Sequence, residues 1–122
     1  MKIRVYFEDT DIGGIVYHSK YINFCERARS EVLFKNGLSP FDSATNSGYI
    51  VSSLTCNFIK TATLGDILEV KTTVKSTSKV KFTLLQEIFK ENEKIFEMEI
   101  LLVYLKNGKP ARLDTKFLEL FS

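Results

Sequence analysis

The sequence predicts an α+β fold in which one long helix packs against an antiparallel sheet of about five strands. Residues 19–36 place apolar side chains at three- and four-residue spacing, which is typical of a helix with one apolar face. Residues 49–106 instead alternate apolar and polar side chains in four runs, which is typical of strands. One helix laid across the apolar face of such a sheet gives a two-layer fold.

The first strand is expected at residues 2–8, where Ile3, Val5 and Phe7 share one face. The sequence "DTDIGG" that follows predicts a loop, because its glycines permit backbone conformations that other residues resist. Residues 38–48 are rich in turn formers and predict a second loop.

The long helix is expected between these two loops. Its apolar stripe consists of Tyr21, Ile22, Phe24, Cys25, Ala28 and Val32. His18 or Ser19 is the candidate N-terminal cap, and Gly37 is the candidate C-terminal stop.

Four strands joined as hairpins are expected after Gly48. They are the stretches "YIVSSLTCNFIK", "DILEVKTTVKS", "KVKFTLLQEIFKE" and "EKIFEMEILLVYLKNGK". The tail "DTKFLELFS" predicts a last strand or a helical turn.

At 122 residues the chain is expected to form one domain, residues 1–122. Its 17 basic and 15 acidic residues give a net charge of +2, too small to indicate nucleic-acid binding through bulk electrostatics. The chain shows no secretory signal and no apolar run near the ~18 residues of a membrane span, so a cytoplasmic location is expected. Cys25 and Cys56 are expected to be free thiols. One histidine and two distant cysteines do not furnish an ordinary zinc site, and no metal or other cofactor is expected.

The stretch "FEDTDIGGIVYHSKY", residues 7–21, concentrates two aspartates, two glycines and the chain's one histidine. A calcium loop is disfavoured, because Gly13 and Lys20 occupy the fifth and twelfth positions, where oxygen ligands are needed. An aspartyl-phosphate enzyme is also disfavoured. Gly13 takes the Thr or Val place of its motif, and hairpins follow where βαβ units are needed.

The same stretch has the components of acyl-transfer chemistry. Backbone N–H groups at a helix N-terminus have no internal partners, so those near Tyr17, His18 and Ser19 are expected to polarise a carbonyl. Asp11 lies upstream on the glycine-containing loop and supplies a nucleophile or a base for water.

The run "RVYFEDTDIGGIVYHSKYINFCERARSE", residues 4–31, resembles the hot-dog-fold acyl-CoA thioesterases, specifically the 4-hydroxybenzoyl-CoA thioesterase group and its YbgC-like bacterial members. The resemblance continues more weakly over residues 49–70. It implies a long helix wrapped by an antiparallel sheet, dimers that pair their sheets, and an active site at the subunit interface.

By this resemblance Asp11 is the catalytic carboxylate, and His18 marks the helix start whose backbone amide polarises the thioester carbonyl. The imidazole of His18 is a further catalytic candidate. Gly14 is the loop glycine between them, Tyr17 belongs to the oxyanion loop, and Asp9 has a structural role. The candidates for substrate contacts are Tyr21, Ile50, Val51, Ser52 and Lys60. The candidates for holding the phosphates of coenzyme A are Lys60, Lys79, Lys81, Lys109 and Arg112.

Three positions depart from the family pattern: Phe7 replaces a common tyrosine, Lys20 the usual asparagine, and Thr61 a common proline. The catalytic candidates also have structural alternatives. Asp11 is open to interpretation as an Asx-turn residue, and His18 as a helix cap or an interface residue.

The expected reaction is hydrolysis of an acyl-CoA, or of an acyl-carrier-protein thioester, to a free acid and a thiol. Asp11 acts in it as nucleophile or as general base. By the resemblance the protein is a homodimer or a tetramer built of two dimers. The alternative is a non-catalytic module of the same fold that binds acyl-CoA or an acyl-carrier protein as a partner in envelope or phospholipid metabolism.

Overall fold

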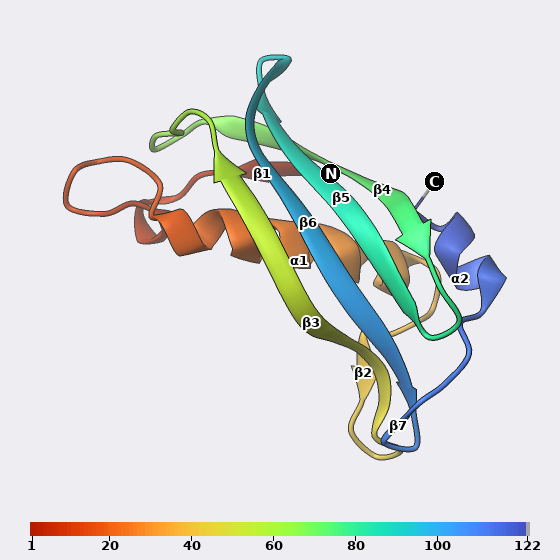
Figure 1. Ribbon diagram of the computed structural model, residues 1–122. Helices are drawn as coiled ribbons and strands as arrows, with labels where there is room; N and C mark the ends of the chain where they lie inside the picture. Colours follow the sequence, from red (N-terminus) through yellow and green to blue (C-terminus); the bar gives the residue numbers. More distant parts are fainter. Residues whose placement is uncertain (122) are drawn as a thin grey trace.

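The computed structural model describes residues 1–121; Ser122, the last residue of the predicted domain, lies outside the described residues. One long helix, α1 (His18–Lys35), lies across one face of a seven-stranded antiparallel sheet (Figure 1). The predicted α+β class is therefore confirmed. The sheet has two more strands than the five expected, and each of these, β2 (Phe41–Asp42) and β7 (Lys109–Pro110), is only two residues long.

The other five strands form the body of the sheet in the order β1-β4-β5-β6-β3, with β2 beyond β3 and β7 beside the end of β6. They are β1 (Lys2–Arg4), β3 (Ser47–Phe58), β4 (Ile67–Thr77), β5 (Lys81–Lys90) and β6 (Glu93–Lys106). The prediction of consecutive hairpins is wrong for β3, which pairs with β6 and not with β4. Alternation along a strand determines which face is buried but not which strand lies beside it.

The hairpin turns after β5 and β6 have local sequence causes. Glu91 and Asn92 both adopt positive φ angles, 50° and 67°, as a two-residue turn between antiparallel strands requires. Asn107 and Gly108 do the same at 53° and 79° and turn the chain into β7.

Helix α1 begins one residue before the predicted start. Its N-cap residue is Tyr17, which makes no side-chain capping bond, so the expectation of a His18 or Ser19 cap is wrong. The helix ends as predicted. Gly37 has φ 72° and donates its N–H to Phe34 O at 3.1 Å, and Leu38 donates its N–H to Leu33 O.

The predicted strand over residues 2–8 is too long. Pairing with β4 ends at Arg4, and Phe7–Asp9 forms a short 3-10 helix. The Asp9 carboxylate accepts a hydrogen bond from Tyr6 N at 2.9 Å, and such a local bond favours a turn over a strand. As a result Phe7 is 81% exposed, although Ile3 and Val5 are buried as expected.

The core lies between α1 and the sheet face that packs against it. Helix residues Tyr21, Phe24, Cys25 and Ala28 are buried there with the alternating inner residues of the strands, which include Leu68, Val70, Leu84, Ile88, Phe96, Met98, Ile100 and Leu102. The tail forms a helical turn, α2 (Thr115–Glu119), as one of the two predicted options. Neither helix in residues 1–121 is both long and apolar enough to span a bilayer.

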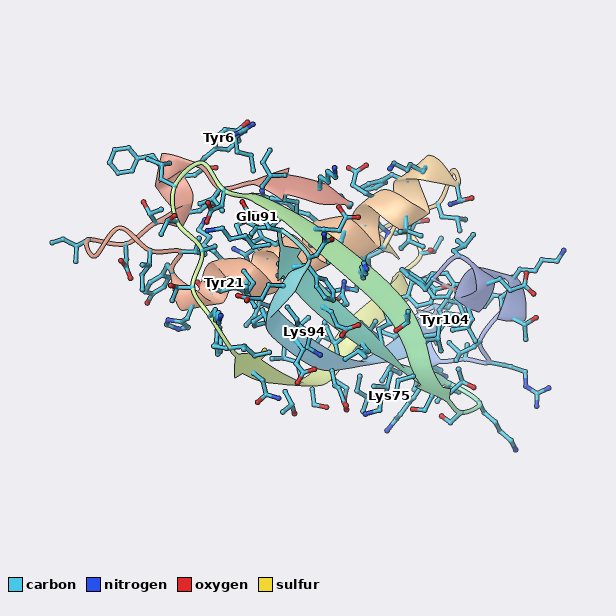
Figure 2. All side chains as sticks on the ribbon, turned by 90° about the horizontal axis from the view of Figure 1, so that it is seen from above. Tyr6, Tyr21, Lys75, Glu91, Lys94 and Tyr104 are labelled. Carbon is cyan, nitrogen blue, oxygen red and sulfur yellow. The ribbon has the colours of Figure 1, made fainter. Side chains whose placement is uncertain are left out.

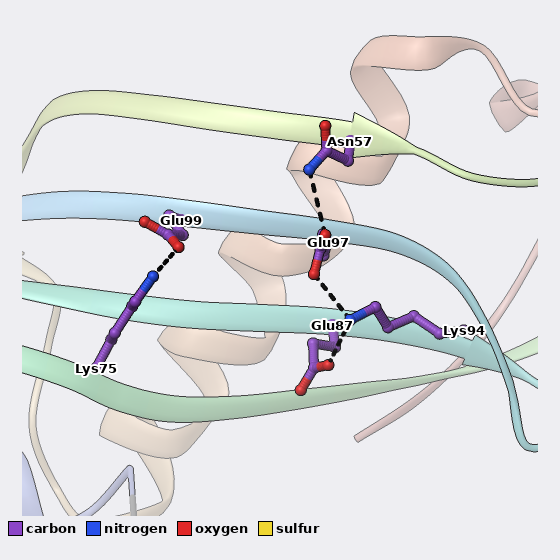
Figure 3. Close-up of polar contacts among 6 residues, drawn as sticks. All are labelled: Asn57, Lys75, Glu87, Lys94, Glu97 and Glu99. Atoms are coloured by element: carbon purple, nitrogen blue, oxygen red, sulfur yellow. Dashed lines mark hydrogen bonds and ion pairs between the residues drawn. The ribbon is translucent and has the colours of Figure 1, made fainter.

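The opposite face of the sheet carries ion pairs (Figure 3). Lys94 lies between Glu87 and Glu97 at 3.0 and 2.8 Å, and Lys75 pairs with Glu99. Asn57 donates a further hydrogen bond to Glu97. The charged side chains keep this face polar and leave α1 as the layer that covers the apolar face.

Replacement of Gly48 tests how closely β2 and β3 approach each other. A Cβ at this position would lie 2.3 Å from Pro40 O, and the residue has φ 148°. We expect Gly48→Ala to lower the free energy of unfolding by more than ~2 kcal/mol, measured by urea denaturation. Gly37→Ala is the matched control, because Gly37 also has a positive φ but a Cβ there would meet no other atom. This substitution should lower the free energy of unfolding by about 1 kcal/mol. Equal losses for the two variants would contradict the close approach.

Candidate active site

A cavity of about 330 Å³ lies where α1 begins. Three segments enclose it: the loop before α1, the first turn of α1, and the chain just after β3. Five of its lining residues are sequence candidates: Asp11, Tyr17, His18, Tyr21 and Lys60. The other five, Ile15, Val16, Phe58, Ile59 and Thr61, were not predicted as site residues.

Backbone bonds shape the loop that carries Asp11. Asp11 donates its N–H to Ile15 O at 2.9 Å and accepts Gly14 N at 3.0 Å, which closes a tight turn. Gly14 has φ 81°, a conformation that side chains disfavour. Gly14 therefore shapes the loop and does not line the cavity. Val16 then donates to Ala62 O at 2.9 Å, so the loop is tied to the segment after β3.

The Asp11 carboxylate is partly committed to its own loop. Its Oδ1 accepts a hydrogen bond from Gly13 N at 2.8 Å, so the Asx-turn alternative is present in the structure. Its Oδ2 has no hydrogen-bond partner among residues 1–121, and the side chain lines the cavity. The turn thus holds one oxygen and leaves the other available to a ligand.

The first turn of α1 supplies unpaired donors. Tyr17 N donates to Asp9 O at 2.9 Å and Lys20 N to Tyr17 O at 2.9 Å, whereas the amides of His18 and Ser19 have no acceptor in the described part of the chain. Such amides, together with the positive end of the helix dipole, stabilise negative charge.

Two aromatic rings lie near the His18 imidazole. The ring centroid of Tyr17 lies 4.5 Å away, and that of Phe58 lies 6.4 Å away in an edge arrangement. The imidazole makes no hydrogen bond within residues 1–121 and does not cap the helix. It is exposed at the cavity and available to a bound molecule.

Tyr21 forms a buried wall of the site near the start of α1 (Figure 2). Its ring stacks on Phe96 at 5.3 Å, and its hydroxyl accepts a hydrogen bond from Ala62 N at 3.0 Å. Burial raises the pKa of this phenol. The side chain therefore joins α1 to the segment after β3.

Lys60 lines the cavity and pairs with Glu93 at 2.8 Å. The remaining substrate candidates, Ile50, Val51 and Ser52, lie on β3 and do not line this cavity. Val51 instead borders a second cavity of about 190 Å³ toward α2.

The two thiols, the metal-ligating side chains and the larger hollow of the structure bear on which chemistry the site can perform. Burial raises the pKa of the Cys25 thiol to about 12, and neither Cys25 nor Cys56 lines the site, so a thiolate nucleophile is disfavoured. No three metal-ligating side chains gather within the described residues. A larger hollow of about 580 Å³ lies between β1, β4 and the β5–β6 turn, but it contains none of the candidate residues.

A long helix laid across an antiparallel sheet is typical of the hot-dog fold, and in this chain Asp11 and His18, whose amide is unpaired in residues 1–121, line one cavity at the helix start. The profile of the thioesterase superfamily matches residues 13–97, and the chain belongs to this superfamily. The resemblance seen in the sequence is thus confirmed.

Similar proteins agree with this membership. A Helicobacter pylori protein named acyl-CoA thioesterase YbgC is 43% identical over 89 residues, which are 73% of this chain and 65% of that protein. The match therefore spans less than two thirds of that relative. An Escherichia coli protein named acyl-CoA thioester hydrolase YbgC is 38% identical over 103 residues, 83% of this chain and 77% of that protein. The structure of 4-hydroxybenzoyl-CoA thioesterase from Pseudomonas shares the fold, with a TM-score of 0.84 at 21% identity over 98% of this chain and 96% of that one.

Replacement of Tyr21 tests its bond to Ala62. We expect Tyr21→Phe to keep the ring but leave Ala62 N buried and unbonded, which costs ~1–3 kcal/mol of the free energy of unfolding. Tyr17→Phe serves as the control, because the Tyr17 hydroxyl has no partner within residues 1–121, and it should change stability by less than ~0.5 kcal/mol. Urea denaturation of both variants makes the comparison. Equal stability of Tyr21→Phe and the wild type would contradict a structural role of the hydroxyl.

Proposed function

We propose that this protein hydrolyses acyl-CoA thioesters to a free acid and coenzyme A. The observation that carries the proposal is the presence of the Asp11 carboxylate and the unpaired His18 amide on one cavity. The names of the similar proteins, which describe acyl-CoA thioesterases, support the same activity.

The helix start stabilises the charge that develops during the reaction. The thioester carbonyl oxygen binds at the amides of His18 and Ser19, so attack on the carbonyl carbon places negative charge at donors that are already oriented. A thiol like that of cysteine has a pKa of roughly 8.5, so coenzyme A leaves as a thiolate without obligatory protonation.

Asp11 takes part in the reaction in one of two ways. As nucleophile, its Oδ2 forms a bond to that carbon, the carbon–sulfur bond breaks, and water then hydrolyses the mixed anhydride and restores the carboxylate. As general base, it takes a proton from water as the water attacks, and the proton passes to the leaving thiolate. In either case the bond from Gly13 N fixes Oδ1 and orients Oδ2. The His18 imidazole contacts the thioester or the attacking water.

The proposed assembly is a homodimer, or a tetramer of two dimers, in which β3 of one copy pairs with β3 of the second copy. Beyond Gly48, no strand among residues 1–121 covers the second edge of β3. Ile50, Val51, Leu54 and Phe58 on this strand are 39–51% exposed. An antiparallel pairing centred on Leu54 sets Ile50 of each copy opposite position 58 of the other. The substrate candidates on β3 then come beside the cavity of the second copy.

The same arrangement supplies cations for the phosphates of coenzyme A. Lys79, Lys81, Lys109 and Arg112 lie where the β4–β5 turn meets β7 and the tail, and none of them pairs with a carboxylate in residues 1–121. In the dimer this end of one copy lies near the cavity of the other, which already contains Lys60. We assign these cations to the phosphates. A cytoplasmic location, a single domain over residues 1–122 and acyl-carrier-protein substrates stay predictions.

The first test measures thiol release from a panel of acyl-CoAs and acyl-carrier-protein thioesters. We expect Asp11→Asn to lower kcat by ~10²–10⁴-fold, because the amide neither attacks nor accepts a proton but still accepts the bond from Gly13 N. Asp42→Asn is the matched control, since Asp42 makes an equivalent turn with Ala44 N in a distant loop. Undiminished turnover in Asp11→Asn would contradict the mechanism. Ligand binding without turnover in the wild type would support the non-catalytic module.

A second test addresses the dimer. We expect Leu54→Lys to give a monomer in sedimentation velocity, because like charges then face each other across the two-fold axis. Thr73→Lys, at an exposed position of β4, which β5 and β6 separate from β3, should leave the wild-type mass unchanged. A Leu54→Lys variant that keeps that mass would place the interface elsewhere.

A further inference from the structure

Lys20 occupies an electrostatically unfavourable place. It lies in the first turn of α1, where the positive end of the helix dipole disfavours a cation. Its Nζ lies 3.9 Å from Oδ1 of Asp9, and its side chain is only 27% exposed. A lysine at this position therefore needs a compensating interaction, and the Asp9 carboxylate is the anion that provides it.

The buried Asp9 carboxylate in turn requires a cation to compensate its charge. Its side chain is 1% exposed, and burial of an uncompensated charge is costly. Oδ2 accepts a hydrogen bond from Tyr6 N, but Oδ1 is buried without any hydrogen bond in the described part of the chain. The ammonium of Lys20 is the cation paired with this oxygen.

Asp9 connects the short 3-10 helix to the start of α1. Its carboxylate holds Tyr6 N at 2.9 Å, and its backbone carbonyl accepts Tyr17 N, also at 2.9 Å. One residue further on, Thr10 pairs with Val16. Asp11 follows directly, so the position of Asp9 is transmitted to Asp11 through two residues of paired backbone.

We propose that Lys20 is a positioning residue for the reaction: by balancing the charge of Asp9 it fixes the loop that sets the Asp11 carboxylate against the amide of His18. This inference rests on the proposed function. Lys20 does not line the cavity, so it acts through Asp9 and not on the substrate. Lys20, one of the three positions that depart from the family pattern, thus supplies an ion pair of its own.

A double-mutant cycle separates this role from a general one. We expect Lys20→Met to lower kcat by ~10- to 100-fold, since small displacements of a reacting group have effects of this size, while KM changes less than ~2-fold. Lys20→Arg should keep most of the activity. In an Asp9→Asn background, Lys20→Met should have no further effect, because the charge it balances is gone. Lys35→Met is the control, a lysine of the same helix with no ion pair in residues 1–121.

Amide hydrogen exchange provides a measurement that does not depend on turnover. We expect Lys20→Met to speed exchange at Tyr6 and Tyr17, whose N–H groups bond to Asp9, and Lys35→Met to leave both rates unchanged. Unchanged kcat and unchanged exchange in Lys20→Met would overturn the inference. So would an equal loss of kcat in the Asp9→Asn background.

Two further outcomes also have a defined consequence for the inference: a wild type without turnover, and a Lys20→Met variant that does not fold. If the wild type releases no thiol, the proposed function fails and exchange alone decides: faster exchange supports the positioning of the loop by Lys20, and unchanged exchange overturns it. If Lys20→Met does not fold, the double variant Asp9→Asn with Lys20→Met, which removes both charges, is used instead. Its kcat is compared with that of the single variant Asp9→Asn. Equal kcat values then support the inference, and a further loss overturns it.

Discussion

The contact between Gln86 and α1 determines how the helix sits on the sheet. Apolar packing alone tolerates small rotations and shifts of a helix, whereas a buried polar group needs its hydrogen bonds. Gln86 is fully buried on β5; its Nε2 donates to Cys25 O at 2.9 Å and to Thr72 Oγ1 at 3.0 Å, and its Oε1 accepts from Arg29 at 2.8 Å. The network satisfies the amide in one placement of α1, which selects that placement.

A second polar contact fixes the other end of the helix. Tyr21 accepts a hydrogen bond from Ala62 N, and Val16 donates to Ala62 O. The segment after β3 is therefore held both by the helix and by the loop that precedes it. With Gln86 anchoring the middle of α1 and Tyr21 its first turn, the amides of His18 and Ser19 have a defined direction. The candidate site depends on that direction, because amides stabilise an oxyanion only when they point at it.

Charge is distributed to match this architecture. The outer sheet face is neutralised by paired lysines and glutamates, so it offers little apolar surface for another layer. The uncovered edge of β3 instead carries exposed apolar side chains. Unpaired cations gather at the end of the sheet away from the start of α1. These three features agree with the assembly proposed above, in which edges pair and the ends of two copies meet.

The residues that face the core and the position of the catalytic candidates could be predicted from local sequence patterns. Period-two and period-3.6 patterns follow from local backbone geometry, so the inner faces of β4 and β6, the helix stripe and the stop at Gly37 were predictable. Asp11, Tyr17, His18 and Tyr21 share one short stretch, and their meeting at one cavity followed from a loop running into a helix.

The contacts between distant segments could not be predicted in this way, because they arise from the fold of the whole chain. The pairing of β3 with β6 brings Phe58 and Ile59 to the start of α1, and no local pattern encodes a strand's neighbour. The shortening of β1 follows from the carboxylate of Asp9, which is buried beside Lys20 and accepts a hydrogen bond from Tyr6 N. Side-chain periodicity reports the environment of each residue, whereas the site is made of contacts between residues tens of positions apart, which form only when the whole chain has folded.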